Sequence, residues 1–504
     1  MSSSSTASTF RPTSVWRWYD SAPVRIVALA AGLTAAPAYE AHRLLALADQ
    51  DIWWRLRTGL WMLQSHAIPR TGIFSQAAAR AWIDAGWGFD LLVAIAYRSF
   101  GLAGLPIFLM LLQIAAALAL FQLAYLACGR FWHALILVAI AQYCIMPIQP
   151  RPGMCSLLLL AVELAILLEA RRTGDERVLY CLPALFALWV NLDRQFTYGL
   201  MVLALFCLAA IVEALVRGRR SVWIDLPLPA VRLGTVGVIA AACLLATFVS
   251  PYTWRLHGLL WNSVTSSTAD RYFRELHSMR FRQPRDYLLM LLAMAAFFAL
   301  GRRRSRDLFL FSLLVVSTVI SFRMMRDNWL VVVVAVALIG NALATGEAVK
   351  ESSRNSGQLR LIALGVSAVV IISTAVLAAN LPSRTSLMSA VSDTFPVAAG
   401  DYIKKNHLSG PLFNAYPWGG FLTWYLPEYP VSIDGRTDLY GDGYDAEYFR
   451  LMQAEVPLES DPSFAQAQTI LLESNSPLAQ ALSTLADFSV AYRDRIAIVL
   501  VRNR

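Results

Sequence analysis

The chain has 504 residues and a formal net charge of +9, and it is 57% hydrophobic but only 15% charged. Soluble domains are roughly 45–50% apolar and about 25% charged, so this composition excludes an ordinary soluble protein and predicts a polytopic α-helical membrane protein. Much of the arginine stands in short clusters between apolar runs, as is typical of cytoplasmic loops. The positive charge therefore does not indicate nucleic acid as a partner.

The N-terminal segment 1–23 is rich in Ser and Thr and has no small-residue cleavage site after it. It is predicted to be a cytoplasmic tail before an uncleaved first span. The six cysteines lie in or beside apolar runs without metal-ligand spacing, so we interpret them as small buried residues. The polar C-terminal region has no cysteine and needs no disulfide.

A transmembrane domain is predicted for residues 24–379, because a span needs about 20 mostly apolar residues and about 11 such segments follow the tail. The predicted spans are 24–41, 103–127, 132–149, 154–170, 178–192, 196–216, 232–251, 286–301, 307–322, 329–346 and 361–379.

If the segment 86–100 does not cross the membrane, all the basic clusters between the predicted spans fall on the cytoplasmic side. That segment is short and carries Asp90 and Arg98, so it is predicted to be an interfacial helix within an external loop, 42–102. The clusters are Arg11/Arg17, Arg130, Arg171/Arg172, Arg217/Arg219/Arg220, Arg302/Arg303/Arg304/Arg306 and Lys350/Arg354/Arg360.

Charged residues gather on the predicted outer face, where a charge near the hydrocarbon edge is usually paired or functional. Arginine offers a fork of donors to phosphate oxygens, and a carboxylate can take a proton from an acceptor hydroxyl. The alternatives are that the arginines reach the headgroups and that the first two acids cap the following helix. The set is Asp49, Asp51, Arg151, Asp193, Arg194, Arg323, Arg326 and Asp327.

The stretch 51–75 begins with apolar residues at helical spacing. Trp53, Trp54 and Trp61 suit the headgroup level of a membrane, and the Pro69 and Gly72 region stops the helix. We therefore expect a surface helix that holds Asp51 at the mouth of the bundle. The alternative is that the aromatic residues are only an anchor.

A first span followed by an external loop that opens with acids resembles the GT-C superfamily of membrane glycosyltransferases. The block DQDIWWRLRTGLWMLQSHAIPRTGIFS resembles bacterial relatives of the dolichyl-phosphate-mannose-type (family 39-like) transferases, whose common form is D-x-D-x-W-W-H-L-x-x-G with a later I-P-x-x-D-x-F-S. The matching residues are Asp49, Asp51, Trp53, Trp54, Gly59, Pro69 and Ser75.

Four residues depart from the pattern of this family. Arg55 stands where His is usual and Gly72 where Asp is usual. The segment WVNLDRQF resembles the family's W-x-N-x-H-G-x-F, with Asp193 and Arg194 in place of His and Gly. These departures predict either a different substrate or a loss of activity.

The C-terminal region, 380–504, alternates short strand-like and helix-like segments and is predicted to be a small extracytoplasmic α/β domain with a partly parallel sheet. The predicted strands are PLFNAY, PVSIDG, TILLE, FSVAYRD and IAIVLVR, and the predicted helices are 395–406, 444–455 and 477–485.

The sharpest string of this domain, NAYPWGGFLTWYLPEYPVSIDGRTDLYGD, is similar to a W-G-G and I-D-G-R pattern in the same uncharacterised bacterial group. Asp434, Arg436 and Asp438 follow a predicted strand end, a common place for ligand contacts. One interpretation is an acceptor-site loop facing Asp51. The other is an Asp–Gly turn with an ion pair that holds the domain on the bundle. Phosphate-binding glycine loops and zinc-ligand spacings are absent from the sequence.

The resemblance implies transfer of a sugar from a polyprenyl-phosphate donor to a glycan, lipid or protein acceptor outside the cytoplasmic (inner) membrane. It gives Asp51 and Asp49 the catalytic role, and a divalent metal is permitted by the two acids but not required. A degenerate scaffold that binds an envelope partner is the first rival, and a transporter ranks last because no repeated halves are visible. The expected substrate-binding residues are Arg323, Arg326, Arg151, Arg194, Trp53, Trp54, Asp434 and Arg436.

Overall fold

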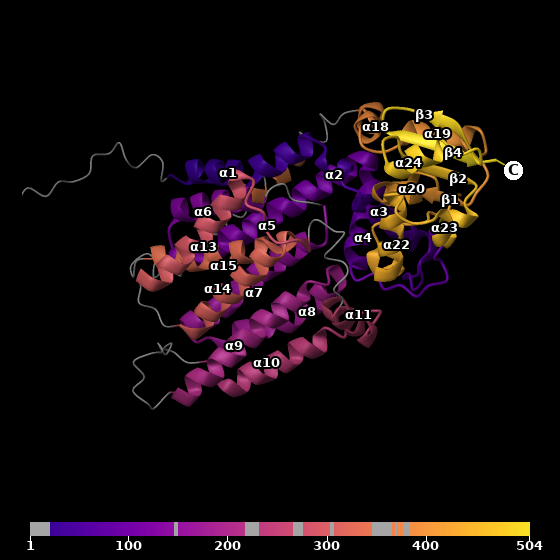
Figure 1. The fold of residues 1–504 in the computed structure, drawn as a ribbon. Coiled ribbons are helices and arrows are strands. Elements are labelled where there is room, and N and C mark those ends of the chain that lie inside the picture. The colour runs from indigo at the N-terminus through magenta and orange to yellow at the C-terminus, as the bar shows by residue number, and fades with distance from the viewer. Residues whose placement is uncertain are drawn as a thin grey trace, which may run out of the picture.

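The computed structural model describes residues 21–145, 150–216, 231–265, 276–302, 307–344, 365–367, 370–371, 373–375 and 383–503. Helices make up 71% of the structure. A bundle of long helices forms one side of the molecule, and a small domain with a sheet forms the other (Figure 1). Most of the predicted tail, most of 361–379 and the basic clusters at 217–220, 303–306 and 350–360 lie outside the described residues.

Each predicted span from 24–41 to 329–346 coincides with a helix. These helices are α1 (Ala22–His42), α5 (Gly104–Cys128), α6 (Phe131–Ile145), α7 (Gly153–Thr173), α8 (Leu182–Leu192), α9 (Phe196–Val216), α10 (Leu233–Ala246), α13 (Pro284–Arg302), α14 (Leu308–Arg323) and α15 (Trp329–Leu343).

Six helical stretches of the described chain are long and apolar enough to cross a membrane, so the protein is membrane-embedded. Helices α6, α10 and α14 are equally apolar but shorter. The six stretches are Ala22–His42, Trp87–Cys128, Gly153–Thr173, Phe196–Val216, Pro284–Arg302 and Met325–Leu343.

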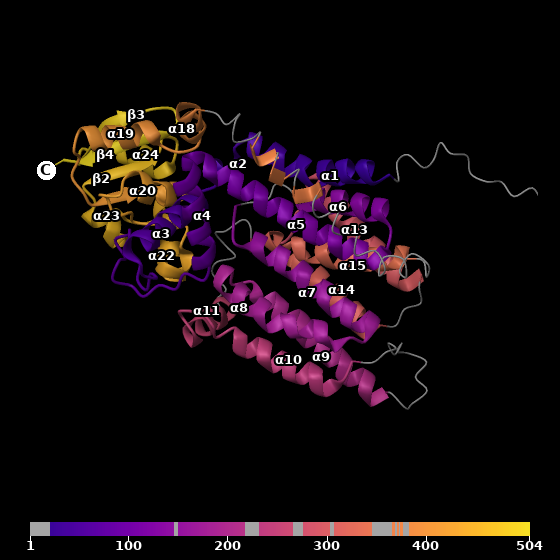
Figure 2. The ribbon, with the colours of Figure 1, turned by 180° about the vertical axis from the view of Figure 1, so that it is seen from behind.

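The bundle has a main group of helices and a smaller group. Helix α5 packs against α1, α6, α7 and α15 in the main group, and the valine-rich α15 is buried along most of its length. Helices α8, α9 and α10 pack on one another and reach the main group through α7 and α14, and both views show them along one side (Figures 1 and 2). The seam between α7 and α9 therefore joins the two groups.

The described connections between helices gather at two ends of the bundle (Figure 1). At the end that carries the C-terminal domain, the Tyr252 hydroxyl donates to the Pro69 carbonyl, and the Met279 N–H donates to the Phe322 carbonyl. At the other end, Arg171 donates to the carboxylate of Glu213. Loops that are distant in sequence thus share one end.

Short helices fill the space between the bundle and the C-terminal domain. Helix α2 (Leu45–Ala48) leads into α3 (Asp51–Ser65), which packs between α4 (Trp87–Phe100) and the C-terminal domain. Protein therefore covers α3 on two sides, and the position of 51–75 at the membrane surface stays a prediction. Helix α4 continues into α5 through the short turn Gly101–Ala103.

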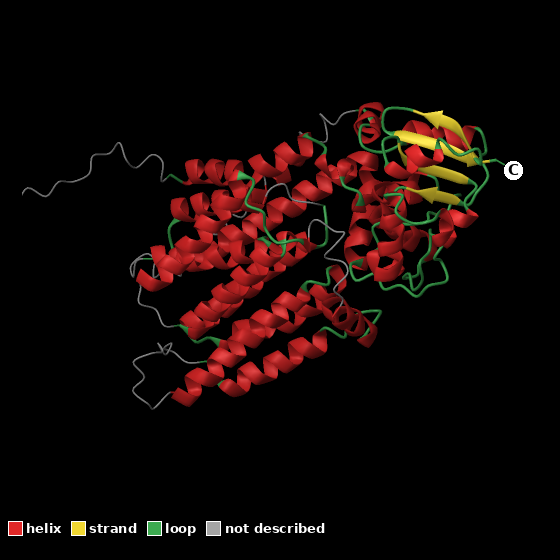
Figure 3. Ribbon diagram, in the orientation of Figure 1, coloured by secondary structure: helices red, strands yellow, loops and turns green. Residues whose placement is uncertain are grey.

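The C-terminal domain is an α/β domain with a four-stranded sheet in the order β1-β2-β4-β3 (Figure 3). Strand β1 pairs with β2 in parallel and the other pairs are antiparallel, which confirms the predicted partly parallel sheet. The predicted strand at 430–435 is wrong, since this segment only bridges Ser75 through Val431. The strands are β1 (Leu412–Asn414), β2 (Thr469–Glu473), β3 (Phe488–Arg493) and β4 (Ala497–Arg502).

The helices predicted for this domain are confirmed with shifted ends. A left-handed Gly441, with φ of +82°, precedes the helix predicted at 444–455, which begins at Asp442. The principal helices of the domain are α18 (Arg384–Ser392), α19 (Val397–Lys405), α20 (Gly419–Tyr425), α21 (Thr437–Tyr440), α22 (Asp442–Met452), α23 (Pro462–Gln466) and α24 (Pro477–Leu482).

Candidate functional site

The candidate site begins at the N-terminus of α3, where the two predicted catalytic acids stand. The Asp49 carboxylate accepts hydrogen bonds from the backbone N–H of Asp51 at 2.8 Å and of Ile52 at 3.2 Å. Asp49 therefore caps the helix, which is the alternative that its position allowed. The Asp51 carboxylate accepts a hydrogen bond from the indole N–H of Trp54 at 3.2 Å.

Arg151, at the start of α7, joins these acids from the opposite side. Its Nη2 lies 3.2 Å from Oδ2 of Asp51, and its Nε lies 3.9 Å from Oδ2 of Asp49. Burial and the Asp51 charge raise the pKa of Asp49 from 3.8 to about 6, although Arg151 opposes this rise. The structure thus brings together Arg151 and two predicted site residues that precede it by about 100 positions.

Arg55, which stands where the family pattern has His, forms a buried ion pair that sequence reasoning missed. Its Nη1 lies 2.8 Å from Oδ1 of Asp90, and its guanidinium lies 4.2 Å from the ring centroid of Trp54. Asp84 lies close by, and burial followed by the charge of Asp90 raises its pKa well above the ordinary value. The spacing DAGWGFD, with acids on both sides of two glycines, is the sequence signal for this cluster.

Two buried carboxylates lie in turns between helices, Asp193 between α8 and α9 and Asp327 between α14 and α15. The Asp193 carboxylate accepts a hydrogen bond from the Ser156 hydroxyl, and burial is the main cause that raises the pKa of Asp193. The Asp327 carboxylate accepts from the Gln195 amide at 2.6 Å and from the Tyr198 hydroxyl. These acids are tied into the bundle rather than directed toward open solvent.

Arg323 and Arg326, which are predicted to bind the donor phosphate, do not share one site. Arg326 lies beside Asp327, with 3.6 Å from its Nε to Oδ1. Arg323 is exposed and lines an open hollow of about 410 Å³ with His277 and Arg280, whose side chains are 2.8 Å apart. The residues that line this hollow belong to 276–280 and 323–324 and include none of the acids of the candidate site.

The segment 434–436 of the C-terminal domain lies on the N-terminus of α3. A side chain at Gly435 would overlap the Asp51 carboxylate and lie 2.9 Å from the indole nitrogen of Trp54. A side chain at Gly420 would meet the backbone carbonyl of Gln50 at 2.5 Å. Glycine is therefore needed at both positions for this close approach.

Asp434 and Arg436 form a fully buried ion pair with each other, at 2.7 Å between Nη2 and Oδ2. Arg436 also donates to the Ile73 carbonyl at 2.8 Å and stacks on Trp82 at 4.9 Å. Both side chains therefore have their partners within the protein. Their geometry fits the second interpretation of the IDGR motif, an ion pair that fastens the domain to the loop after α3.

Arg194 makes a second link between the two parts of the molecule. Its Nη1 lies 3.0 Å from Oδ2 of Asp438 in α21, and both side chains are about one third exposed. Such an exposed pair contributes little stability. The link nevertheless brings two predicted ligand residues together as partners of each other.

Protein buries Trp53 and Trp54, so the prediction that they are anchors exposed to lipid headgroups is wrong. Trp53 is fully buried and packs on Phe395, Phe421 and Trp424 of the C-terminal domain, with ring centroids 4.8–5.7 Å apart. Trp54 packs edge-on against Trp82. The two indoles form the apolar contact that joins α3 to the domain, so we do not assign them to a substrate.

No family model matches this sequence, and a search of curated proteins finds no similar chain. The geometry of the site therefore has to support any function by itself. Within the described ranges, no three His, Cys, Asp or Glu side chains lie close enough to hold a metal ion, and Arg151 stands beside the two acids that could have contributed to one.

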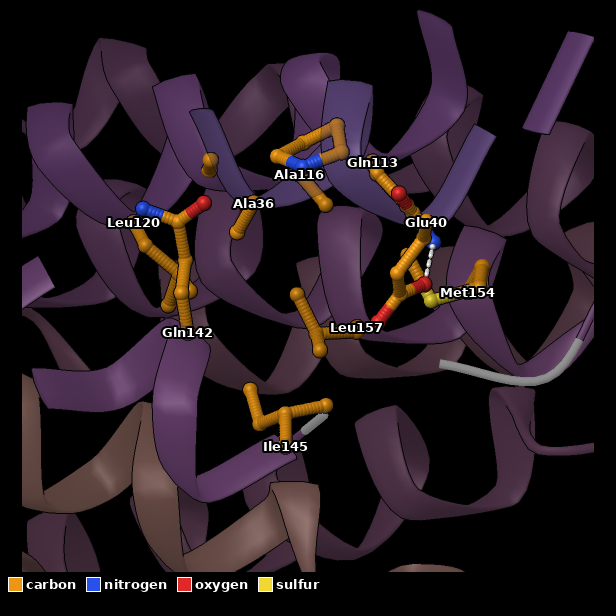
Figure 4. Close-up of a pocket in the computed structure, with 11 residues that line it drawn as sticks. Ala36, Glu40, Gln113, Ala116, Leu120, Gln142, Ile145, Met154 and Leu157 are labelled. Carbon is orange, nitrogen blue, oxygen red and sulfur yellow. Dashed lines mark hydrogen bonds between the residues drawn. The ribbon is translucent and has the colours of Figure 1, made fainter. Parts of the chain in front are cut away.

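A separate, mostly apolar pocket of about 20 Å³ lies inside the bundle, between α1, α5, α6 and α7 (Figure 4). The Gln113 amide donates to the Glu40 carboxylate at 2.7 Å, while Gln142 lies on the opposite side of the pocket and donates to the Gly32 carbonyl. A space of this size can hold about one water molecule. Met154, which lines this pocket, donates its backbone N–H to the carbonyl of Arg151, the residue that pairs with Asp51.

Proposed function

We propose that the chain is a membrane glycosyltransferase of the GT-C type, with about 11 spans, that acts on a polyprenyl-phosphate-linked sugar. We infer that it lies in the cytoplasmic (inner) membrane with the C-terminal domain on the extracytoplasmic side. The main support is the pair formed by Asp51 and Arg151 at 3.2 Å. This pair sets a carboxylate beside a guanidinium at the junction of the bundle and the C-terminal domain.

In the proposed reaction, the Asp51 carboxylate takes the proton of the acceptor hydroxyl while that oxygen bonds to the anomeric carbon of the sugar. The bond from this carbon to the donor phosphate oxygen breaks, and the polyprenyl phosphate leaves with the bonding electrons. Arg151 faces the negative charge that grows on this leaving group. The sugar, the lipid and the acceptor are defined in this proposal only by their chemical class.

Asp51 suits the role of base better than Asp49. The Asp51 side chain is 14% exposed, against 8% for Asp49, and one Asp49 oxygen is already used by two backbone N–H groups. Arg326 remains a proposed phosphate contact at the same end of the bundle. Asp434 and Arg436 are left out because they are fully buried in an ion pair with each other. Arg194 is left out because it pairs with Asp438 at 3.0 Å, whereas Arg326 lies 3.6 Å from Asp327.

A degenerate scaffold that binds an envelope partner is the second candidate. The observation that favours it is the state of the acids at α3: Asp49 is a cap, Asp51 contacts Arg151 and Gly435, and Asp90 is paired with Arg55. An acid cluster that is satisfied internally can serve to position the C-terminal domain without any chemistry.

Sugar transfer in isolated membranes tests the first candidate. Membranes with and without the chain are incubated with a panel of polyprenyl-phosphate sugars that carry a radioactive label. We expect label to move from the lipid to a water-soluble or lipid acceptor only where the chain is present. Equal transfer in both membranes, across the panel, would reject the enzyme and leave the scaffold.

A further inference from the structure

Glu163 lies about halfway along α7 and is fully buried. Within the described residues, neither of its carboxyl oxygens has a hydrogen-bond partner. An isolated carboxylate in an apolar interior is costly enough that the group takes a proton instead, and acidic residues inside membrane spans are rare and usually functional. The proposed sugar transfer does not use this residue.

The space around Glu163 is shaped by residues of three other helices. A side chain at Gly199 of α9 would lie 2.8 Å from Oε2 of Glu163 and 2.5 Å from the Trp189 ring of α8. Helix α10 contributes the Cys243 thiol, which is the titratable neighbour that its packing brings to Glu163. Glycine in α9 therefore makes the room that the carboxyl occupies.

Polar contacts hold the seam between α7 and the α8–α10 group at both ends. Ser156 of α7 bonds Asp193 at one end, and Arg171 of α7 bonds Glu213 of α9 at 2.8 Å at the other. Ser156, Glu163 and Arg171 are about two helical turns apart and so lie on one face of α7. Along α7, Glu163 therefore lies midway between the Ser156–Asp193 hydrogen bond and the Arg171–Glu213 ion pair.

We propose that Glu163 is a membrane-embedded proton-binding site, and that α9 packs against α7 there only while the carboxyl carries its proton. When the two helices separate, water reaches the group and accepts the proton, which leaves a carboxylate that opposes reclosure. Binding a proton restores the neutral acid and the packed seam. This inference does not rest on the proposed sugar transfer.

The first test compares the thermal unfolding of the full chain with that of Glu163→Gln over a pH series in detergent. The amide is neutral at every pH, so its variant does not depend on a proton at this site. A glutamate in the unfolded chain has a pKa of about 4.3. Above this pH, the ratio of folded to unfolded molecules should fall by up to tenfold per pH unit in the native chain relative to the variant.

Glu40→Gln is the matched control, because Glu40 is also a buried carboxyl of a span but accepts a hydrogen bond from Gln113. We expect the pH dependence to change more in Glu163→Gln than in this control. Parallel curves for the native chain and Glu163→Gln would overturn the proposal.

A second measurement covers the case in which Glu163→Gln does not fold. A lipid-soluble carbodiimide adds to protonated carboxyls, and mass spectrometry of native membranes locates the adduct. We expect an adduct at Glu163 that forms at least tenfold faster than one at Glu40. If Glu163 stays unmodified while exposed carboxyls react completely, the seam does not open to release or take up a proton, and the proposal fails.

Discussion

Gly435 of the C-terminal domain lies directly against the carboxylate of Asp51, at the first residue of α3. The two residues are far apart in sequence and belong to different parts of the molecule. Their contact makes the C-terminal domain one wall of the candidate site, so changes in that domain should affect the chemistry assigned to Asp51.

Gly435→Ala should impair both folding and transfer. The new methyl group would overlap Asp51 and press on Trp54, and such overpacking typically costs about 1–3 kcal/mol. Thermal unfolding and the transfer assay measure the two effects. Gly443→Ala is the control, since nothing lies within 4 Å of a side chain there; equal behaviour of the two variants would contradict the contact.

Asp434→Asn should loosen the C-terminal domain from the bundle. The change leaves Arg436 as an unpaired buried cation, which costs roughly 3–5 kcal/mol. Limited proteolysis should then release the domain faster. Asp438→Asn breaks only the exposed pair with Arg194, for which we expect about 1 kcal/mol or less. Similar losses from both variants would contradict the assignment of the buried pair as the main fastener.

Asp49→Asn should change how stability depends on pH. The pKa of Asp49 is raised from 3.8 to about 6 in the folded chain, so the folded state binds this proton more tightly than the unfolded state does. This contribution favours folding below about pH 4 and is lost as pH rises toward 6, by an amount on the order of 2–3 kcal/mol.

Asparagine can still cap α3 but has no proton to lose. The stability of the variant relative to the native chain should therefore rise between about pH 4 and pH 7, as measured by unfolding midpoints. A constant difference across this range would mean that Asp49 does not carry the shifted pKa.

Trp53→Ala should weaken the junction more than a change at the membrane surface would. Trp53 packs on three aromatic residues of the C-terminal domain, and removing a buried tryptophan costs roughly 3–5 kcal/mol. Trp261→Ala is the control, because this side chain is 72% exposed. Comparable destabilisation by the two changes would argue that Trp53 is not a core residue.

The lengths of the apolar segments were sufficient to predict the helices of the bundle, because a run of about 20 apolar residues rarely forms anything other than a membrane-spanning helix. It could not identify what covers each face. Trp53 and Trp54 have the sequence of an interfacial belt, yet Trp53 packs on aromatic residues of the C-terminal domain and Trp54 on Trp82 of the loop after α3. An indole is equally suited to headgroups and to an aromatic core, so only the tertiary contacts decide.

The candidate site was predictable in part. Asp49, Asp51 and Arg151 meet as the arrangement of spans implied, since segments on one side of a bundle share one end. The pairing of Arg55 with Asp90 was missed, because it depends on how α4 folds back on α3, and the acids of DAGWGFD alone do not name their partner. The ion pair of Arg436 with Asp434 was one of the two interpretations of the IDGR motif, but the loop that Arg436 contacts at Ile73 could not be predicted.

The transfer rate of Asp51→Asn is the most direct test of the central claim. The amide has nearly the shape of the carboxylate and can accept the Trp54 hydrogen bond, but it cannot take the acceptor proton. With unchanged amounts of folded protein in the membrane, sugar transfer should fall about 10²–10⁴-fold. Transfer at the native rate would contradict the account and leave Asp51 as a structural residue of the junction.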